Sequence, residues 1–339
     1  MAQISQPQSL QIEALKGHRL GPYLSHNPVS ATQIWQWCSV MGDNNPLYLP
    51  GDNQLAPPAM VQMWTMRDVN DCYAPGSTDV PPYQVFAEMT ALGYPANVAT
   101  SYEICFFRYL RTGERAKHFT TVANISDRKT TALGVGYFVT ERVEYLTLDD
   151  SPFAEALITY FQYAPLVATE NNGRESSTTG ITKRDALASE SDHRSPENRY
   201  GVKSVLAVGD ELPELVIPIT HKLIVAGATA TQDFTPVHHT LPVAQAAGMP
   251  DIFMNILTTC GLSVRYLTDW GGDGSKLRQI NFKLKAPNLP GDAMRLRGEV
   301  VALNSEPEYA LVEIAFTGRN RLGVHISGTA ILAMPMKSE

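Results

Sequence analysis

The stretch Asp233-Phe234-Thr235-Pro236-Val237-His238 has a counterpart in Asp43-Asn44-Asn45-Pro46-Leu47-Tyr48. Both carry the pattern Asp-x-x-Pro, and each lies ahead of a methionine-bearing stretch with helix-like spacing. Later in each half a turn precedes a strand-like run, at 112–114 and again at 290–292, and each half ends on an apolar strand. This shared order indicates an internal duplication, with one copy of the pattern in each half.

A polar segment separates the two halves of this 339-residue chain. Residues 169–180 contain no apolar side chain, and residues 189–198 are rich in serine and in charged side chains. Such a composition cannot bury enough apolar surface to offset the entropy lost on ordering. We therefore predict a first domain over residues 1–167, a flexible linker over 168–200 and a second domain over 201–339.

The hydrophobic spacing predicts one helix in each half, over residues 59–70 and 251–267, among several strands. Residues 277–285, 296–303 and 310–317 are expected to be strands of the second half. A helix followed by a run of antiparallel strands indicates the α+β class, with a sheet wrapped around a central helix. The chain has no G-x-G-x-x-G or Walker A pattern, which argues against Rossmann and P-loop domains.

Charge and cysteine content exclude several classes of function. The formal net charge is -7, so nucleic acid is not expected as a partner. The four cysteines are scattered and form no C-x-x-C pair, which argues against a zinc ribbon or a redox motif. No stretch has the features of a signal peptide or the length of a membrane span. We expect a cytoplasmic protein that does not associate with a membrane.

Asp233 and His238 are the residues best suited to chemistry. They lie five residues apart, and a turn at Thr235-Pro236 would bring them toward a common space. A carboxylate and an imidazole suit general acid–base chemistry on a water molecule. The alternative is that Asp233 caps a helix and that His238 and His239 are solvated loop residues. No metal is expected, because adjacent histidines rarely point toward one ion.

The segment from Asp233 to His238 resembles the D-x-x-P-x-H core of the MaoC-like family, the R-specific enoyl-CoA hydratases of the hydratase 2 type. The family usually has Asn where this chain has Thr235. The resemblance covers residues 210–335, where a helix, a strand running from Phe282 to Pro287, a Pro-Gly-Asp turn and a closing strand follow in the family's order. It implies a double hot-dog fold, in which each of two domains wraps an antiparallel sheet around a central helix.

Other stretches resemble the hydratase subunits of actinobacterial steroid side-chain degradation. Residues 251–259 are similar to the small catalytic MaoC-like subunit, and residues 56–60 and 64–66 to its non-catalytic partner. The resemblance implies that both are fused here on one chain. Tyr48 stands where the motif of the first half would have its histidine, and tyrosine, with an ordinary pKa of about 10, is a poor base near neutrality. The first domain is therefore expected to be catalytically silent and to shape the acyl pocket.

The resemblance also implies the roles of individual residues. Asp233 and His238 would activate a water that adds to the β-carbon of a trans-2-enoyl thioester, and a backbone N–H near Asn255 would stabilise the enolate. His239 is expected to be a neighbour of the base. The acyl pocket is expected to be lined by Met60, Met63, Trp64 and Phe253. The methionines and the tryptophan equally suit a plain core. The CoA phosphates are expected at three basic residues, Arg278, Lys283 and Lys285, for which a solvated strand face is the alternative.

We therefore expect hydration of a trans-2-enoyl-CoA to a 3-hydroxyacyl-CoA with a bulky, steroid side-chain acyl group. No cofactor is expected, since the CoA thioester is the substrate. One alternative is a hot-dog thioesterase, but these enzymes usually carry a carboxylate on the central helix, and the predicted helix has none after Asp251. Another is a non-catalytic acyl-CoA-binding or scaffold subunit. A homodimer and an association with a β-oxidation or aldolase partner are further expectations. Residues 71–100 are expected to form either a lid or a surface loop.

Overall fold

The structure is a computed structural model, and it describes residues 13, 15–131, 133–165 and 206–336. The described residues up to 165 are called the first half below, and residues 206–336 the second half. The predicted linker over 168–200 lies outside the described residues, so the domain boundaries stay a prediction.

A single sheet of 11 strands runs through both halves in the order β1-β3-β5-β6-β2-β8-β11-β10-β9-β7, with β4 pairing beside β5. The strands of the first half are β1 Arg19–Leu24, β2 Ala96–Phe106, β3 Ala116–Ile125, β4 Lys129–Thr130, β5 Gly134–Thr147 and β6 Pro152–Pro165. Those of the second half are β7 Glu211–Ile219, β8 Lys276–Leu284, β9 Asp292–Ser305, β10 Tyr309–Asn320 and β11 Gly323–Pro335. All neighbouring strands pair antiparallel.

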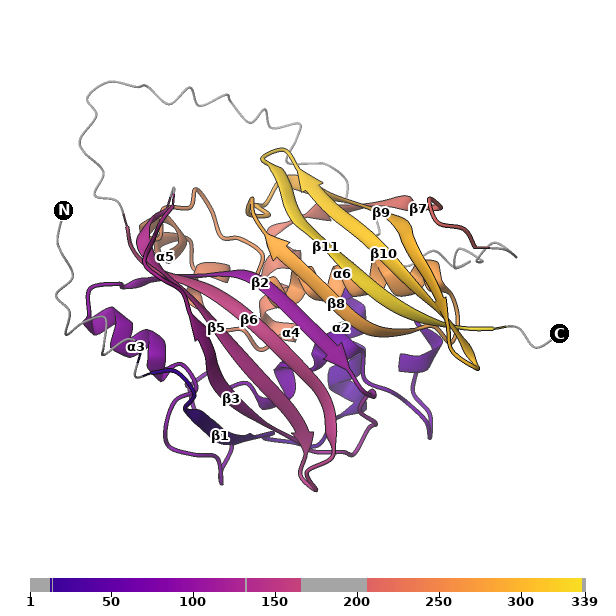
Figure 1. The fold of residues 1–339 in the computed structure, drawn as a ribbon, viewed down its shortest axis with the longest axis horizontal. Helices are drawn as coiled ribbons and strands as arrows, with labels where there is room; N and C mark the ends of the chain where they lie inside the picture. Colours follow the sequence, from indigo (N-terminus) through magenta and orange to yellow (C-terminus); the bar gives the residue numbers. More distant parts are fainter. Residues whose placement is uncertain (1–12, 14, 132, 166–205, 337–339) are drawn as a thin grey trace.

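The two halves join where β2 pairs with β8, the purple and orange strands near the middle of Figure 1. Tyr102 lies opposite Phe282 and Ile104 opposite Ile280, and all four side chains are buried. A free edge strand would expose a row of unpaired backbone groups. The pairing satisfies both edges and carries one core from the first half into the second, which is the arrangement of a double hot-dog.

Three helices contact one another on one side of the sheet (Figure 1): α2 Ala31–Met41, α4 His221–Ala230 and α6 Ile256–Gly271. α6 is the central helix of the second half, because all of its residues from Leu257 to Gly271 are buried and because β8 and β11 contact it. A shorter helix follows each of α2 and α4 in the sequence: α3 Gln84–Ala91 comes after α2, and α5 Leu241–Ala246 comes after α4. The predicted α+β class is confirmed. Within the described residues, no helix has the length and apolarity needed to cross a membrane.

The central helix of the second half begins later than the sequence predicts. Asn255 caps it, since its side-chain oxygen accepts a hydrogen bond from Thr258 N at 2.7 Å. Asp251, the predicted start, instead accepts a hydrogen bond from Ile252 N and lies 3.1 Å from His221 Nε2. The residues between Asp251 and Asn255 therefore lie outside the helix, and Phe253 and Met254 among them line a cavity.

The helix predicted over residues 59–70 is wrong. The structure has only two short 3-10 turns there, η2 Pro58–Met60 and η3 Met63–Thr65. Val61 and Gln62 form a turn between the two 3-10 segments, and Met66 ends the second of them in an extended conformation. The apolar spacing reports burial instead, because Met60, Met63 and Trp64 all belong to the core.

Candidate active site

The two Asp-x-x-Pro stretches have the same local structure. Each follows a helix, α2 or α4, and the aspartate amide donates to a carbonyl of that helix, at 2.9 Å for Asp43 and 3.0 Å for Asp233. Each proline then begins a short 3-10 helix, η1 Pro46–Tyr48 or η5 Pro236–His238. Tyr48 and His238 therefore occupy equivalent positions in two repeated units.

Asp233 and His238 are brought together as the sequence predicts. Asp233 Oδ2 lies 3.5 Å from His238 Nε2, and 15% and 9% of the two side chains are exposed. Asp233 Oδ1 accepts hydrogen bonds from Thr235 N at 3.3 Å and from Thr235 Oγ1 at 2.6 Å. Thr235, the departure from the family pattern, thus holds one carboxylate oxygen and leaves the other toward the imidazole. A separation of 3.5 Å is longer than an ordinary hydrogen bond, so both groups can contact the same small molecule.

One hydrogen bond decides the tautomer of His238. Its Nδ1 lies 2.7 Å from the carbonyl oxygen of Phe253. A carbonyl oxygen only accepts, so Nδ1 carries the proton, and in the neutral imidazole Nε2 keeps a lone pair. That lone pair lies on the side of the ring nearest Asp233, so a water held between the two side chains can donate a hydrogen bond to it.

Asn255 contributes a side-chain contact that the sequence analysis missed. Its Nδ2 donates to Asp233 Oδ2 at 3.0 Å and to Thr231 Oγ1 at 2.8 Å, while its Oδ1 caps α6. One residue therefore ties the carboxylate to the helix N-terminus. The backbone donors suited to an enolate follow directly, at Ile256 and Leu257, because the first N–H groups of a helix have no partner within it. Both residues line the cavity described next.

A cavity of about 550 Å³ opens beside Asp233 and His238, and both halves form its wall. The second half contributes Phe253, Met254, Leu284 and the start of α6. The first half contributes Gln62, Met66, Tyr83, Phe86 and Tyr160. A volume of this size is typical of a site for a drug-sized ligand. Residues 71–100 thus supply part of the wall, through Tyr83, Phe86 and residues 97–100.

The residues predicted for the acyl pocket separate into two groups. Phe253 lines the cavity, and its ring lies edge-on to the His238 ring with centroids 5.0 Å apart. Met60, Met63 and Trp64 do not line it and pack in the core, as the alternative interpretation expects. Gln62 and Met66, from the same segment, do line it. The 3-10 turns direct side chains differently from an α-helix, so the helical spacing did not predict that Gln62 and Met66 line the cavity.

The basic residues predicted to bind CoA also separate. Lys285 is exposed and lines the cavity, while Lys283 is exposed nearby on β8 without lining it. The Arg278 guanidinium lies 5.7 Å from the centroid of the Tyr309 ring. Of the three, only Lys285 has a place on the wall of the cavity.

His325, on the closing strand β11, is a second imidazole on the cavity wall. Its Nδ1 donates to Ala286 O at 2.6 Å, so its Nε2 accepts from Thr259 Oγ1 at 3.0 Å. Burial lowers the pKa of His325 to about 4, although the hydrogen bond to Ala286 opposes this shift. His325 is therefore neutral near pH 7, with both ring nitrogens engaged.

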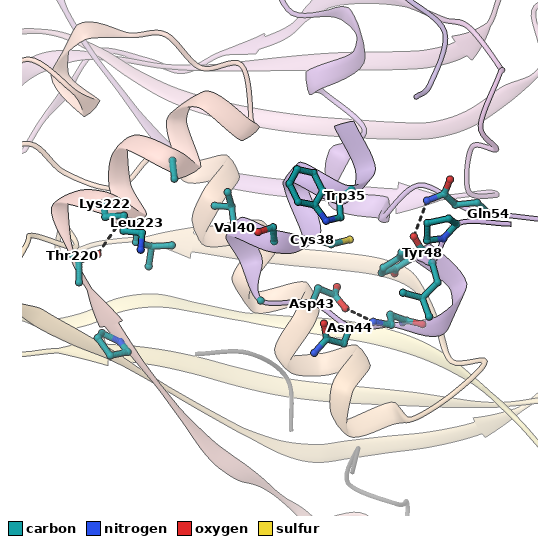
Figure 2. A pocket seen from close by; sticks show the side chains of 17 residues that line it. Trp35, Cys38, Val40, Asp43, Asn44, Tyr48, Gln54, Thr220, Lys222 and Leu223 are labelled. Carbon is teal, nitrogen blue, oxygen red and sulfur yellow. Dashed lines mark hydrogen bonds between the residues drawn. The ribbon is translucent and has the colours of Figure 1, made fainter. Parts of the chain in front are cut away.

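The equivalent position in the first half lies in a separate cavity of about 790 Å³ (Figure 2). Figure 2 shows Asp43 at the end of α2, with Tyr48 to one side and Lys222 and Leu223 of α4 across the cavity. Asp43 Oδ1 accepts from Asn45 N at 2.9 Å, which matches the contact between Asp233 and Thr235. The phenol of Tyr48 replaces the imidazole, so this half keeps the carboxylate without a base near neutrality. Nowhere in the described ranges do three His, Cys, Asp or Glu side chains gather closely enough to hold a metal ion.

No model of a protein family matches the chain. Among solved structures, a MaoC-like dehydratase superposes with a TM-score of 0.69 at 16% identity, covering 96% of this chain and 100% of that one. A Mycobacterium tuberculosis protein with a double hot-dog fold superposes with a TM-score of 0.59 at 13% identity, covering 96% and 98%. These likenesses concern the fold, and they confirm the predicted double hot-dog.

Curated proteins extend the similarity to sequence. The chain is 42% identical over 127 residues to the beta subunit of 3-oxo-4,17-pregnadiene-20-carboxyl-CoA hydratase from Mycobacterium tuberculosis, covering 95% of that protein and 38% of this chain. The chain belongs to the MaoC-like enoyl-CoA hydratase family. This MaoC-like protein is also 31% identical over 139 residues to the alpha subunit named for the same hydratase, covering 38% of this chain and spanning 43% of that subunit's length. A probable enoyl-CoA hydratase alpha subunit of Thermomonospora curvata is 36% identical over 143 residues, covering 38% of this chain and 44% of that protein. The predicted family and hydro-lyase class are confirmed.

Proposed function

We propose that this protein adds water to a trans-2-enoyl-CoA with a bulky, steroid side-chain acyl group and releases the 3-hydroxyacyl-CoA. The observation that carries the proposal is the pair of Asp233 Oδ2 and His238 Nε2, 3.5 Å apart on the wall of a 550 Å³ cavity. Its relatives are named as subunits of enoyl-CoA hydratases, two of them for a steroid acyl-CoA. We also propose that no cofactor takes part, since both substrates are the thioester and water.

The chemistry follows from the tautomer of His238. A water held between Asp233 and His238 gives a proton to Nε2 while its oxygen bonds to the β-carbon. The electrons of the double bond move to the thioester oxygen, and the resulting enolate is stabilised by the N–H groups of Ile256 and Leu257 and by the dipole of α6. The imidazolium then returns the proton to the α-carbon. One water is consumed, and His238 ends in its starting state.

The size proposed for the acyl group rests on the first half. In the second half, α5 and then the long helix α6 follow the Asp-x-x-Pro stretch. In the first half, the segment that follows this stretch and precedes α3 forms the 3-10 turns η2 and η3. Gln62 and Met66 of that segment and Phe86 of α3 form part of the cavity wall. The relatives divide into alpha and beta subunits, and we propose that this chain joins both kinds in one polypeptide. A homodimer and an association with a β-oxidation or aldolase partner stay proposals, as does a cytoplasmic location.

A thioesterase is less well supported. Such an enzyme needs a carboxylate on the central helix near the thioester. α6 extends beyond its predicted end and includes Asp269, but this side chain is paired with Arg265, at 3.2 Å between Oδ2 and Nε, and does not line the cavity. A binding or scaffold subunit does not require the hydrogen bonds that orient Asp233 and His238.

The proposed function is tested by following the loss of enoyl-thioester absorbance. Crotonyl-CoA and a steroid-type 2-enoyl-CoA are compared with wild type, Asp233→Asn, His238→Ala and the control His239→Ala. We expect both site variants to lose at least about a hundredfold in kcat, because acid–base groups contribute effects of this size, while His239→Ala stays near wild type. Wild-type protein without turnover of either thioester, or site variants with full activity, would reject the hydratase and favour the binding subunit.

A further inference from the structure

A small second cavity lies in the first half, beside the catalytic cavity. Its volume is about 30 Å³, room for roughly one water-sized group. Gln62, Met66, Tyr83 and Tyr160 line both cavities, so the two share a wall. Asp233 and His238 do not line the small cavity. The small cavity therefore lies on the other side of this wall from the catalytic cavity.

Glu141 is an unusual side chain for this position. It lies on β5 in line with Val139 and Val143, on the face that points into the core, and only 2% of it is exposed. Within the described structure, Glu141 Oε1 has no hydrogen-bond partner, and neither does Thr120 Oγ1, which lines the same cavity. An unsatisfied buried polar atom costs about 1–3 kcal/mol. Two such atoms in one cavity require an explanation, since buried polar groups are nearly always paired.

The surroundings keep Glu141 protonated. Among the described residues no lysine or arginine lines the cavity. The titratable groups that line it beside Glu141 are Tyr73, Tyr83, His118, Tyr145 and Tyr160, and Tyr23 also interacts electrostatically with Glu141. His118 Nδ1 lies 2.8 Å from Thr65 Oγ1, and burial lowers its pKa to about 3, so it carries no charge. Burial raises the pKa of Glu141 to about 8. Near pH 7 the carboxyl group is therefore an O–H donor.

We propose that Glu141 and Thr120 bind a ring carbonyl oxygen at the end of the acyl group remote from the thioester. The inference rests on the proposed function and names the class of its substrate: a fused-ring 2-enoyl-CoA with a ketone on the distal ring. A carbonyl oxygen accepts two hydrogen bonds and donates none, which matches one carboxyl and one hydroxyl donor. Met66 lies in the shared wall, and its unbranched thioether side chain can move to admit the ring.

The test compares two fused-ring 2-enoyl-CoA substrates that differ only in the distal ring, one with a ketone and one with a methylene. Wild type is measured beside Glu141→Leu, Glu141→Gln, Thr120→Val and the control Thr140→Val. Thr140 lies next to Glu141 on the opposite face of β5, where its hydroxyl contacts Thr159 Oγ1 at 3.0 Å. Crotonyl-CoA, which has no ring, serves as the substrate that cannot reach the small cavity.

We expect wild type to prefer the ketone by about tenfold or more in kcat/KM, the value of one to two buried hydrogen bonds. Glu141→Leu should abolish this preference and leave the methylene substrate and crotonyl-CoA within about threefold. Glu141→Gln should retain part of the preference, because its amide still donates. Thr120→Val should weaken the preference, and Thr140→Val should leave it intact.

Several results would overturn the inference. Equal kcat/KM of the wild type for the two ring substrates would mean that Glu141 holds only a structural water. An equal loss of all three substrates in Glu141→Leu would mean that Glu141 has a general structural role. Binding is measured separately, by calorimetric titration of the wild type and Glu141→Leu with the free fused-ring ketone, which has no thioester. If the ketone binds in a way that depends on Glu141 but the wild type hydrates none of the thioesters, the subsite is supported and the proposed function is rejected. Equal affinity of the wild type and Glu141→Leu for the ketone would reject the subsite.

Discussion

At the scale of single residues, hydrogen bonds decide which of two cavity histidines can act as a base. His238 and His325 both donate through Nδ1 to a backbone carbonyl, at 2.7 and 2.6 Å. His325 Nε2 also accepts a hydrogen bond from Thr259, whereas His238 Nε2 faces a carboxylate that cannot donate when ionised. The lone pair of His238 therefore stays available to a water, and that of His325 does not.

Glu141 gives a prediction on stability at the same scale. Its pKa is about 8 in the folded protein against an ordinary value of 4.5. Between these values the folded state keeps a proton that the unfolded state has lost, so the free energy of unfolding decreases as pH rises, by at most about 1.4 kcal/mol per pH unit. Glu141→Gln cannot titrate, so its stability relative to wild type should increase from pH 5 to pH 8.

Chemical denaturation at several pH values measures this difference. Thr140→Val, on the opposite face of β5, controls for a general change of stability in that strand. A difference between Glu141→Gln and wild type that stays constant from pH 5 to pH 8 would mean that Glu141 ionises normally in the folded protein.

At the scale of secondary-structure elements, the close approach of α4 to α6 positions the site. α4 leads into Asp233, and α6 begins at the cap residue Asn255, whose side chain contacts that aspartate. Gly227 makes the approach possible, because a Cβ built there would lie 2.7 Å from Thr258 Cγ2 in the first turn of α6. One glycine therefore couples the carboxylate to the N–H groups proposed to stabilise the enolate.

Gly227→Ala tests this coupling. The added methyl group should force α4 and α6 apart and cost about 1–3 kcal/mol of stability. Activity on crotonyl-CoA, measured at a temperature where the variant remains folded, should decrease because Asn255 and Ile256 shift relative to Asp233. Val225→Ala, on the exposed face of α4, should change stability by about 0.5 kcal/mol or less. Equal stability and activity for Gly227→Ala and wild type would rule out a tight contact.

At the scale of the whole molecule, the two halves depend on each other in two ways. β2 and β8 are interior strands only because they pair, with Ile104 and Ile280 fully buried at the junction. The cavity also has walls from both halves, although Asp233 and His238, which are proposed to be catalytic, come from the second half alone. Separated halves would each expose an apolar sheet edge, which favours aggregation.

Expression of residues 1–167 and 201–339 as two polypeptides tests this dependence. We expect each fragment alone to be poorly soluble and the pair to copurify with measurable hydratase activity. A β2 variant with a charge at the junction, Ile104→Lys, should abolish copurification, whereas Val98→Lys, at a partly exposed position of the same strand, should not. A second fragment that is soluble and fully active alone on a bulky substrate would contradict this view.

Some features were predictable because they depend on local chemistry. The aspartate, the proline turn and the histidine of residues 233–238 come together through contacts within a few residues, so their spacing was informative. Thr235 departs from the family pattern but still holds the carboxylate. Apolar spacing wrongly predicted a helix over residues 59–70, because side chains buried from two successive 3-10 turns give a pattern similar to that of a helix.

The sequence by itself determined the family, the α+β class and the duplication, and it singled out Asp233 and His238 as the proposed catalytic pair, because each is encoded in short motifs whose geometry is local. The tertiary structure alone decided the start of α6 at Asn255, the tautomer of His238 and the cavity wall supplied by the first half. It also brought Glu141 and Thr120 to one buried cavity from different strands. Most of these features depend on contacts between residues well separated in the chain, and such contacts form only in the assembled fold.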